Sequence, residues 1–236
     1  GVAFTPIPNL AFTADFYHIE IDDRITLSEN FTGEAIRQQL EAQGIFGVNG
    51  GRYFTNAIDT RTNGVDFILR YAYDLGKPGR VKFTAGLNLN DINVTRITPN
   101  PPQLASLNNV LFGRREKARI EEGQPDSKLN LMLNYDWKNF ALMLRTTRFG
   151  EFTTRRNSEA QADRDQTFGA KWITDLDVSY NVSRNLTFGF GGNNIFDIFP
   201  DKTIARNSFN GIFPYPSQSP FGFNGSYYYA RVAIRR

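Results

Sequence analysis

Two carboxylates stand where a pair could perform acid–base chemistry. Asp175 and Asp177 are two residues apart in a segment of alternating polarity, so a β-strand would hold both on one face at ~7 Å. Inverting glycosidases keep their two carboxyl groups at ~6.5–9.5 Å. Polar residues that line a wet interior give the same pattern, and no further enzyme signature accompanies the pair. We therefore expect no enzymatic activity.

Metal, thiol and phosphate sites are also unsupported. The 236-residue chain has no cysteine and a single histidine, His18, which excludes disulfide frameworks, thiolate sites and imidazole-rich metal sites. Asp22 and Asp23 lack the ligand spacing of a calcium loop. The cluster of Gly189, Gly191 and Gly192 lies inside an alternating segment with no helix after it, so it predicts strand curvature or close packing rather than a phosphate loop. We expect neither a metal nor a cofactor.

Binding chemistry gathers instead in segments without alternation. The segment 155–169 carries three arginines whose planar guanidinium groups suit carboxylates or phosphates, and the Pro- and Gly-punctuated segment 209–223 carries aromatic rings. Exposed rings in a loop favour contact with a ligand or partner, although these rings could instead pack against neighbouring loops. The ligand-contact candidates are Arg155, Arg156, Arg164, Phe209, Phe213, Tyr215, Phe221 and Phe223.

Charge is scattered along most of the chain, with 27 basic residues against 24 acidic ones. A nucleic-acid surface would need Lys and Arg gathered in one stripe, so nucleic acid is not an expected partner. The densest charged run, 114–122, reads as a solvated loop. The alternative interpretation of this run is functional: Arg114 and Arg115 would bind phosphate groups of outer-leaflet lipopolysaccharide, or an anionic substrate.

The elements that must position these residues are β-strands. Apolar and polar residues alternate over 65–75, 81–89, 129–137 and 174–182, the period of a strand whose two faces meet different surroundings. Each run reaches the ~9–11 residues that cross a hydrocarbon layer. The apolar set, with Phe83, Leu87, Leu129, Leu131, Leu133, Leu176 and Val178, is expected to face lipid. The polar set, expected to face a lumen, is Asp66, Arg70, Lys82, Asn88, Asn130, Asn134, Arg145, Asp175 and Asp177.

Connections between the strands alternate in length. Short turns are expected near 76–79, 138–139 and 183–185, and long polar loops near 30–50, 98–125, 155–169 and 200–224, with a short helix at Glu34–Gln43. Short turns on one side and long loops on the other indicate an all-β, antiparallel, up-and-down transmembrane barrel segment of about eight strands, whose short turns and C-terminus are periplasmic. These strands lie near 9–27, 52–75, 80–97, 127–137, 140–154, 171–183, 185–197 and 226–236. A soluble β-sandwich binding module alternates too, and a small self-contained barrel acting as an anchor or adhesin is the other alternative.

Several motifs resemble the TonB-dependent outer-membrane receptors. Asn194, Phe196, Asp197 and Pro200 match the Asn-x-Phe-Asp element that follows the penultimate strand and precedes a Pro-containing loop. Upstream, the segment 64–66 reads Gly-Val-Asp, as in a descending strand of the family. The further matches, in the same order along the chain, are Tyr17–Ile25, Gly123-Gln124-Pro125 and Arg148–Glu151.

The resemblance implies import of a scarce nutrient, such as a siderophore, cobalamin or an oligosaccharide. The family's barrel has about twenty-two strands around a plug, so residues 1–236 would form its C-terminal portion, with the plug and the N-terminal strands absent. Partners would be outer-membrane lipid, the remainder of the barrel and its plug, and TonB only through that plug. The family usually ends on an aromatic residue, where this chain has Arg236. An arginine is tolerated near the membrane interface.

Overall fold

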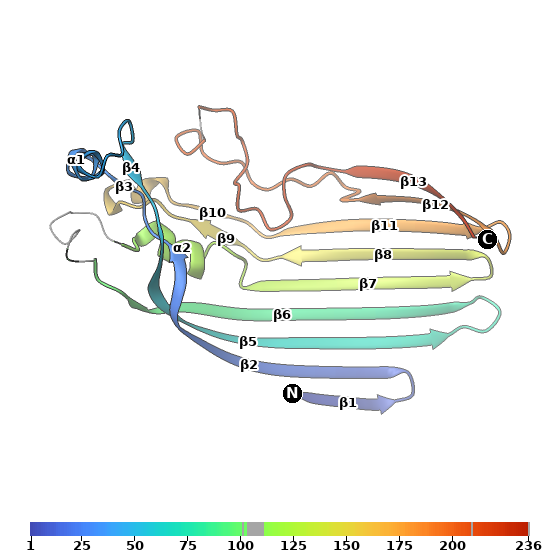
Figure 1. The fold of residues 1–236 in the computed structure, drawn as a ribbon. Helices are drawn as coiled ribbons and strands as arrows, with labels where there is room; N and C mark the ends of the chain where they lie inside the picture. The colour runs from blue at the N-terminus through green and yellow to red at the C-terminus, as the bar shows by residue number, and fades with distance from the viewer. Residues whose placement is uncertain (101, 103–110, 209, 236) are drawn as a thin grey trace.

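A computed structural model describes residues 1–100, 102, 111–208 and 210–235. Nine strands form one large sheet in the order β1-β2-β5-β6-β7-β8-β11-β12-β13, and every neighbouring pair is antiparallel (Figure 1). The strands are β1 (Val2–Ile7), β2 (Leu10–Leu27), β5 (Phe54–Asp74), β6 (Arg80–Ile97), β7 (Ser127–Trp137), β8 (Phe140–Phe149), β11 (Lys171–Asn181), β12 (Leu186–Asn193) and β13 (Tyr227–Ile234). A single large sheet, with β1 and β13 at its edges, differs from the two packed layers of a sandwich.

Short turns gather at one end of the sheet, where the C-terminus also lies, and the long connections gather at the other (Figure 1). At the short end, Asn9 and Lys138 have positive φ angles of 65° and 50°, the left-handed backbone that tight hairpin turns require. The expected up-and-down order with unequal connections is therefore confirmed. No helix within the described residues is long and apolar enough to cross a membrane.

The long connections carry short elements of their own. Between β2 and β5 lie β3 (Phe31–Thr32), α1 (Glu34–Ala42) and β4 (Gly50–Gly51), and between β8 and β11 lie β9 (Phe152–Thr154), the 3-10 helix η2 (Glu159–Arg164) and β10 (Gln166–Phe168). The helix expected at Glu34–Gln43 is thus present. The strand expected over 140–154 is divided into β8 and β9, and β1 lies outside the strands that alternation predicted.

The prediction of a solvated loop over 114–122 was wrong. Residues Arg114–Glu121 form α2, which covers a small apolar core with Phe31, Ile36, Ile58 and Leu111. The helix buries Ala118 and also Glu116, whose carboxylate pairs with Arg52 at 3.0 Å and Arg119 at 2.7 Å. A buried carboxylate is stable only when it is paired and hydrogen-bonded, and these partners come from both within and outside the run.

Strand registers sort the side chains into two sets. One row across the sheet joins Arg70, Thr84, Met132, Arg145 and Asp175, and each residue of such a row points to the same face. All nine polar residues expected at the lumen lie on this face by register. That this face lines a lumen remains a prediction.

The apolar residues occupy the opposite face and leave it uncovered. Of this set, Phe16, Tyr180, Phe188 and Val232 are each about half exposed or more, at 69%, 52%, 49% and 59%. On β5 the apolar set runs over the nine residues from Val65 to Tyr73, about the length that crosses a hydrocarbon layer. Beyond this apolar stretch the same face is polar: in the register of β2 and β5, His18 lies opposite Asn63 and Glu20 lies opposite Arg61.

Two glycines let tyrosines reach across a neighbouring strand on the polar face. Tyr17 lies over Gly64, where an added Cβ would come within 2.0 Å of the ring, and its hydroxyl accepts a hydrogen bond from Asn88 at 3.2 Å. In the same way Tyr229 passes over Gly191 and donates to Asp177 at 2.8 Å. These contacts explain why the Gly-Val-Asp segment and the glycine-rich β12 need residues without a side chain.

Candidate functional site

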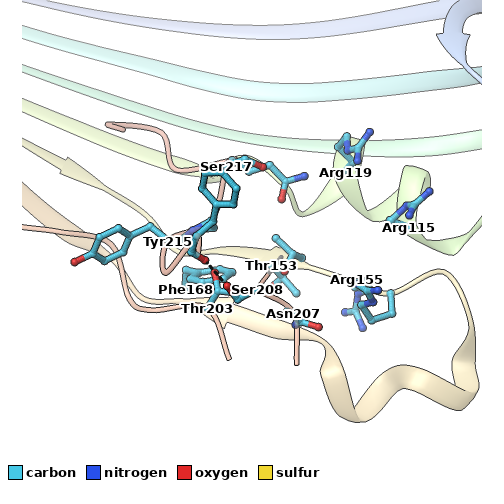
Figure 2. Close-up of a pocket in the computed structure, with 15 residues that line it drawn as sticks. Arg115, Arg119, Thr153, Arg155, Phe168, Thr203, Asn207, Ser208, Tyr215 and Ser217 are labelled. Carbon is cyan, nitrogen blue, oxygen red and sulfur yellow. Dashed lines mark hydrogen bonds between the residues drawn. The ribbon is translucent and has the colours of Figure 1, made fainter. Parts of the chain in front are cut away.

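A cavity lies among the long connections, outside the sheet. It has a volume of about 390 Å³ and is lined by α2, by β9 and the arginines after it, by β10, and by the last long loop. Figure 2 shows Tyr215 at one side and Arg115, Arg119 and Arg155 at the other. The cavity therefore has an aromatic side and a cationic side, drawn from segments far apart in sequence.

A short hairpin forms the floor of this cavity. β9 and β10 pair through Phe152 and Phe168, whose rings stack with their centroids 4.9 Å apart and are both buried. This apolar contact fixes the hairpin, and so fixes where Arg155 and Arg156 leave β9. At the far end of the hairpin loop, Ser158 accepts a hydrogen bond from the Ala160 amide at 3.3 Å and begins η2.

Asp165 organises the cationic side. Its carboxylate accepts two hydrogen bonds from the Arg114 guanidinium, one of them at 3.0 Å, and another from the backbone amide of Arg156 at 2.8 Å. The hydrogen bonds with Arg114 are the main reason that the pKa of Asp165 falls to about 2. The carboxylate therefore stays ionised at neutral pH and holds α2 against the hairpin.

Most of the other arginines around the cavity also pair with a carboxylate of the same chain. Arg155 donates to Glu122 at 2.8 Å, and this pairing is the main cause that raises the pKa of Arg155. Arg115 donates to Glu29 at 2.8 Å. Arg114 is fully engaged by Asp165 and Glu159, so its guanidinium is not free to bind lipid phosphate.

The last long loop is fastened to the hairpin by polar contacts. The side chain of Gln166 accepts from the Ile204 amide at 2.9 Å and donates to the Lys202 carbonyl at 2.7 Å. Asp201 accepts from Lys171 at 2.6 Å and from the Gly169 amide at 2.7 Å, and these bonds, led by that of Lys171, lower its pKa. The loop is therefore held over the cavity by its neighbours.

The motif residues at the start of this loop act as clamps. Asn194 has a positive φ of 50°, and its amide group exchanges two hydrogen bonds with the backbone of Ile198. Its own backbone N–H donates to Asp175 at 2.9 Å, while Asp197 accepts from the Ser226 amide at 2.8 Å. The Asn-x-Phe-Asp element thus joins both ends of the loop to the sheet.

The predicted ligand residues reach different places. Arg155, Arg156, Phe213 and Tyr215 line the cavity together. Arg164 lies beside it and donates to Asn207 at 3.2 Å and to the Arg206 carbonyl. Of the remaining rings, Phe221 packs on Phe149, and Phe223 stacks on Tyr215. Tyr215 also stacks on Phe199. Phe209 lies outside the described residues, as does the terminal Arg236.

Part of the cavity was not predicted from the sequence. Arg119, Thr203, Asn207, Ser208 and Ser217 also line it. Arg119 comes from the charged run 114–122, which forms α2, and the other four belong to the last long loop. These residues follow no alternating pattern, so the available signals were the charge of the run and the place of the others in a loop rich in aromatic residues. The cavity can donate hydrogen bonds to a negatively charged ligand, and it offers ring surface. Among the described residues that line it, no nucleophile lies beside a base.

The fold agrees with what the chain resembles among known proteins. The model of the family described as TonB dependent receptor-like, beta-barrel, matches residues 1–195. The chain belongs to this family. None of the curated proteins matches it.

Solved structures of outer-membrane receptors share the fold. The outer membrane transporter YddB from Escherichia coli matches with a TM-score of 0.64 at 11% identity, over 98% of this chain and 31% of its own. The ferric enterobactin receptor from Pseudomonas aeruginosa, as a variant, matches with a TM-score of 0.58 at 15% identity, over 98% and 29%. The Ferric-Catecholate import receptor Fiu from E. coli gives 0.54 at 12%, over 98% and 26%. The chain spans about a quarter to a third of the length of these structures.

Proposed function

We propose that residues 1–236 form the C-terminal portion of a TonB-dependent outer-membrane receptor, where they supply part of the barrel wall and of the outer loops. The observation that supports this proposal most strongly is that the large sheet has one apolar face and one polar face. The face with Phe16, Phe188 and Val232 is apolar and uncovered, which suits lipid, and the other bears the polar residues. An apolar set of about nine residues fits the hydrocarbon thickness.

The polar face suits the lumen of such a receptor. Arg145 pairs with Asp175 at 2.7 Å, and Arg231 pairs with Asp177 at 2.7 Å. The charges are therefore matched across strands, and about half of each arginine side chain stays exposed on this face. In a complete receptor these side chains would face the plug. The short turns would then lie in the periplasm together with the C-terminus, and the long connections would lie outside the cell.

The cavity among the long connections is where this portion would touch the imported nutrient. Siderophores, cobalamin and oligosaccharides are the candidate classes. Aromatic loop residues would pack against ligands that contain rings, and cationic loop residues would bind ligands that carry negative charge. Lipopolysaccharide would surround the outer end of the apolar face. TonB would act through the plug and would not touch these residues.

Uptake by the complete receptor tests the proposal. The gene encoding the complete protein would be expressed in a host lacking other receptors, with and without TonB, and growth on each nutrient class as sole source would be measured. The proposal requires growth on one class only when TonB is present. Growth that is equal in both hosts would identify a passive pore or an anchor instead.

A further inference from the structure

Arg156 has a cationic group without a partner in the part of the chain that the structure describes. Among the described residues, its guanidinium makes no hydrogen bond or ion pair, although Arg114, Arg115, Arg119 and Arg155 each pair with a carboxylate. The hydrogen bonds of Arg156 to other described residues involve its backbone, which donates to Asp165 and accepts from Arg114 at 3.0 Å. The backbone is therefore fixed while the half-buried side chain is left for another partner.

The surroundings of Arg156 add positive charge to the cavity. Burial lowers the pKa of Arg156, and the cations of Arg164 and Arg115 lower it further. Arg164 itself donates to neutral oxygens of Asn207 and Arg206. Within the described residues these two neighbouring guanidinium groups form no ion pair, although the charge of Asp165 partly offsets their repulsion. An anion bound between them would relieve it further.

One further polar atom of a residue that lines the cavity has no hydrogen-bond partner within the described chain: the buried hydroxyl of Thr203. Buried polar groups without partners are uncommon in folded proteins, and each calls for an explanation such as a bound ligand. Thr203 belongs to the last long loop, whereas Arg156 follows β9, so the two groups come from different segments around the cavity.

Ring surface lies beside these donors. Phe213, at the aromatic side, is 58% exposed. Tyr215, which also lines the cavity, stacks on Phe199 and on Phe223. The volume of about 390 Å³ lies within the range of small-molecule sites, ~300–1,000 Å³.

We propose that this cavity binds an oxyanion, a carboxylate or phosphate, carried on a planar ring, with Arg156 as its main cationic contact. The guanidinium suits two-point binding of such oxygens, the Thr203 hydroxyl adds a donor, and the ring of the ligand packs against Phe213. This inference rests on the proposed function, because it names the chemistry of the ligand that these loops would meet.

Calorimetry on the complete, purified receptor tests the inference. The probes are phenyl phosphate, inorganic phosphate and the neutral benzyl alcohol. Phenyl phosphate should bind most tightly, inorganic phosphate more weakly, and benzyl alcohol without measurable heat. Arg156→Gln should weaken phenyl phosphate binding at least tenfold, equivalent to about 1.4 kcal/mol. Arg184→Gln is the matched control, since it removes the same charge from an exposed position between β11 and β12, at the opposite end of the sheet.

Three results would overturn the inference. One is equal affinity for phenyl phosphate in wild type and Arg156→Gln. Another is an equal loss in Arg184→Gln, which would indicate a general charge effect. The third is a lower melting temperature of Arg156→Gln with unchanged binding, which would mean that Arg156 pairs with another part of the receptor. Failure of TonB-dependent growth while phenyl phosphate binding still depends on Arg156 would count against the proposed function alone.

Discussion

Asp165→Asn should loosen the hairpin that carries Arg155 and Arg156. The carboxylate accepts from Arg114 at 3.0 Å and from the Arg156 amide at 2.8 Å, and hydrogen bonds to charged groups contribute ~1.5–3 kcal/mol each. Asparagine keeps one acceptor oxygen and loses the charge, so we expect a net loss of about 2 kcal/mol in local stability. Local opening would then rise roughly 30-fold.

Hydrogen exchange measures this opening directly. Amides in β9 and β10 should exchange about 30-fold faster in Asp165→Asn, while those in β7 and β8 should be unchanged, because the sheet does not depend on this contact. The control is Asp163→Asn, whose carboxylate is exposed and, among the described residues, pairs with the exposed Arg206 alone. Equal protection of the hairpin in wild type and Asp165→Asn would refute the role given to this carboxylate.

Acid should have the same effect on the wild type. The folded pKa of Asp165 is about 2, below the ~3.9 of an unfolded aspartate. The stabilisation is therefore complete above about pH 4 and is lost as the pH falls toward 2. Hairpin exchange, corrected for intrinsic rates, should rise over this interval in wild type and much less in Asp165→Asn. Parallel profiles for the two proteins would contradict the assignment.

Three other results are expected. Gly191→Ala should destabilise the barrel by ~1–3 kcal/mol, because its Cβ would lie 2.5 Å from the Tyr229 ring and 2.8 Å from the Leu176 carbonyl. The control Gly86→Ala, whose Cβ meets no atom within 4 Å, should have the melting temperature of the wild type. Equal melting temperatures for the two variants would contradict this packing role of Gly191. In the complete receptor, deletion of 210–222 should weaken nutrient binding at least tenfold, about 1.4 kcal/mol, and unchanged affinity in a correctly inserted variant would make this loop only a cover. Residues 1–236 expressed alone should give no TonB-dependent uptake, since they form an open sheet of nine strands; such uptake without another receptor chain would disprove this.

The sheet was predictable because its signal is local. In β7, Leu129, Leu131 and Leu133 alternate with Asn130 and Asn134, and a shift of one residue in this pattern would turn every polar group to the wrong face. β1 carries too short a pattern, broken by Pro6, to be predicted in this way. The helix α2 was missed because its stability comes from contacts with distant residues rather than from an apolar stripe.

The cavity was only partly predictable, for a related reason. Composition indicated that Arg155, Arg156, Phe213 and Tyr215 have binding chemistry, but not that they meet. Their meeting depends on the stacked pair under the hairpin and on polar contacts such as that of Gln166 with the last loop. Which guanidinium is left unpaired likewise depends on where Glu122 and Asp165 lie in space, and neighbours in sequence do not determine it.

Cysteine accessibility along one strand tests the central claim most directly. Single cysteines at Leu131, Leu133, Asn130 and Asn134 of the complete receptor, in intact outer membranes, would be treated with a lipid-soluble and a water-soluble maleimide. We expect the lipid-soluble reagent to label Leu131 and Leu133, and the water-soluble reagent to label the two asparagine positions. Water-soluble labelling at the leucine positions, with protection at the asparagine positions, would contradict the assignment of the two faces.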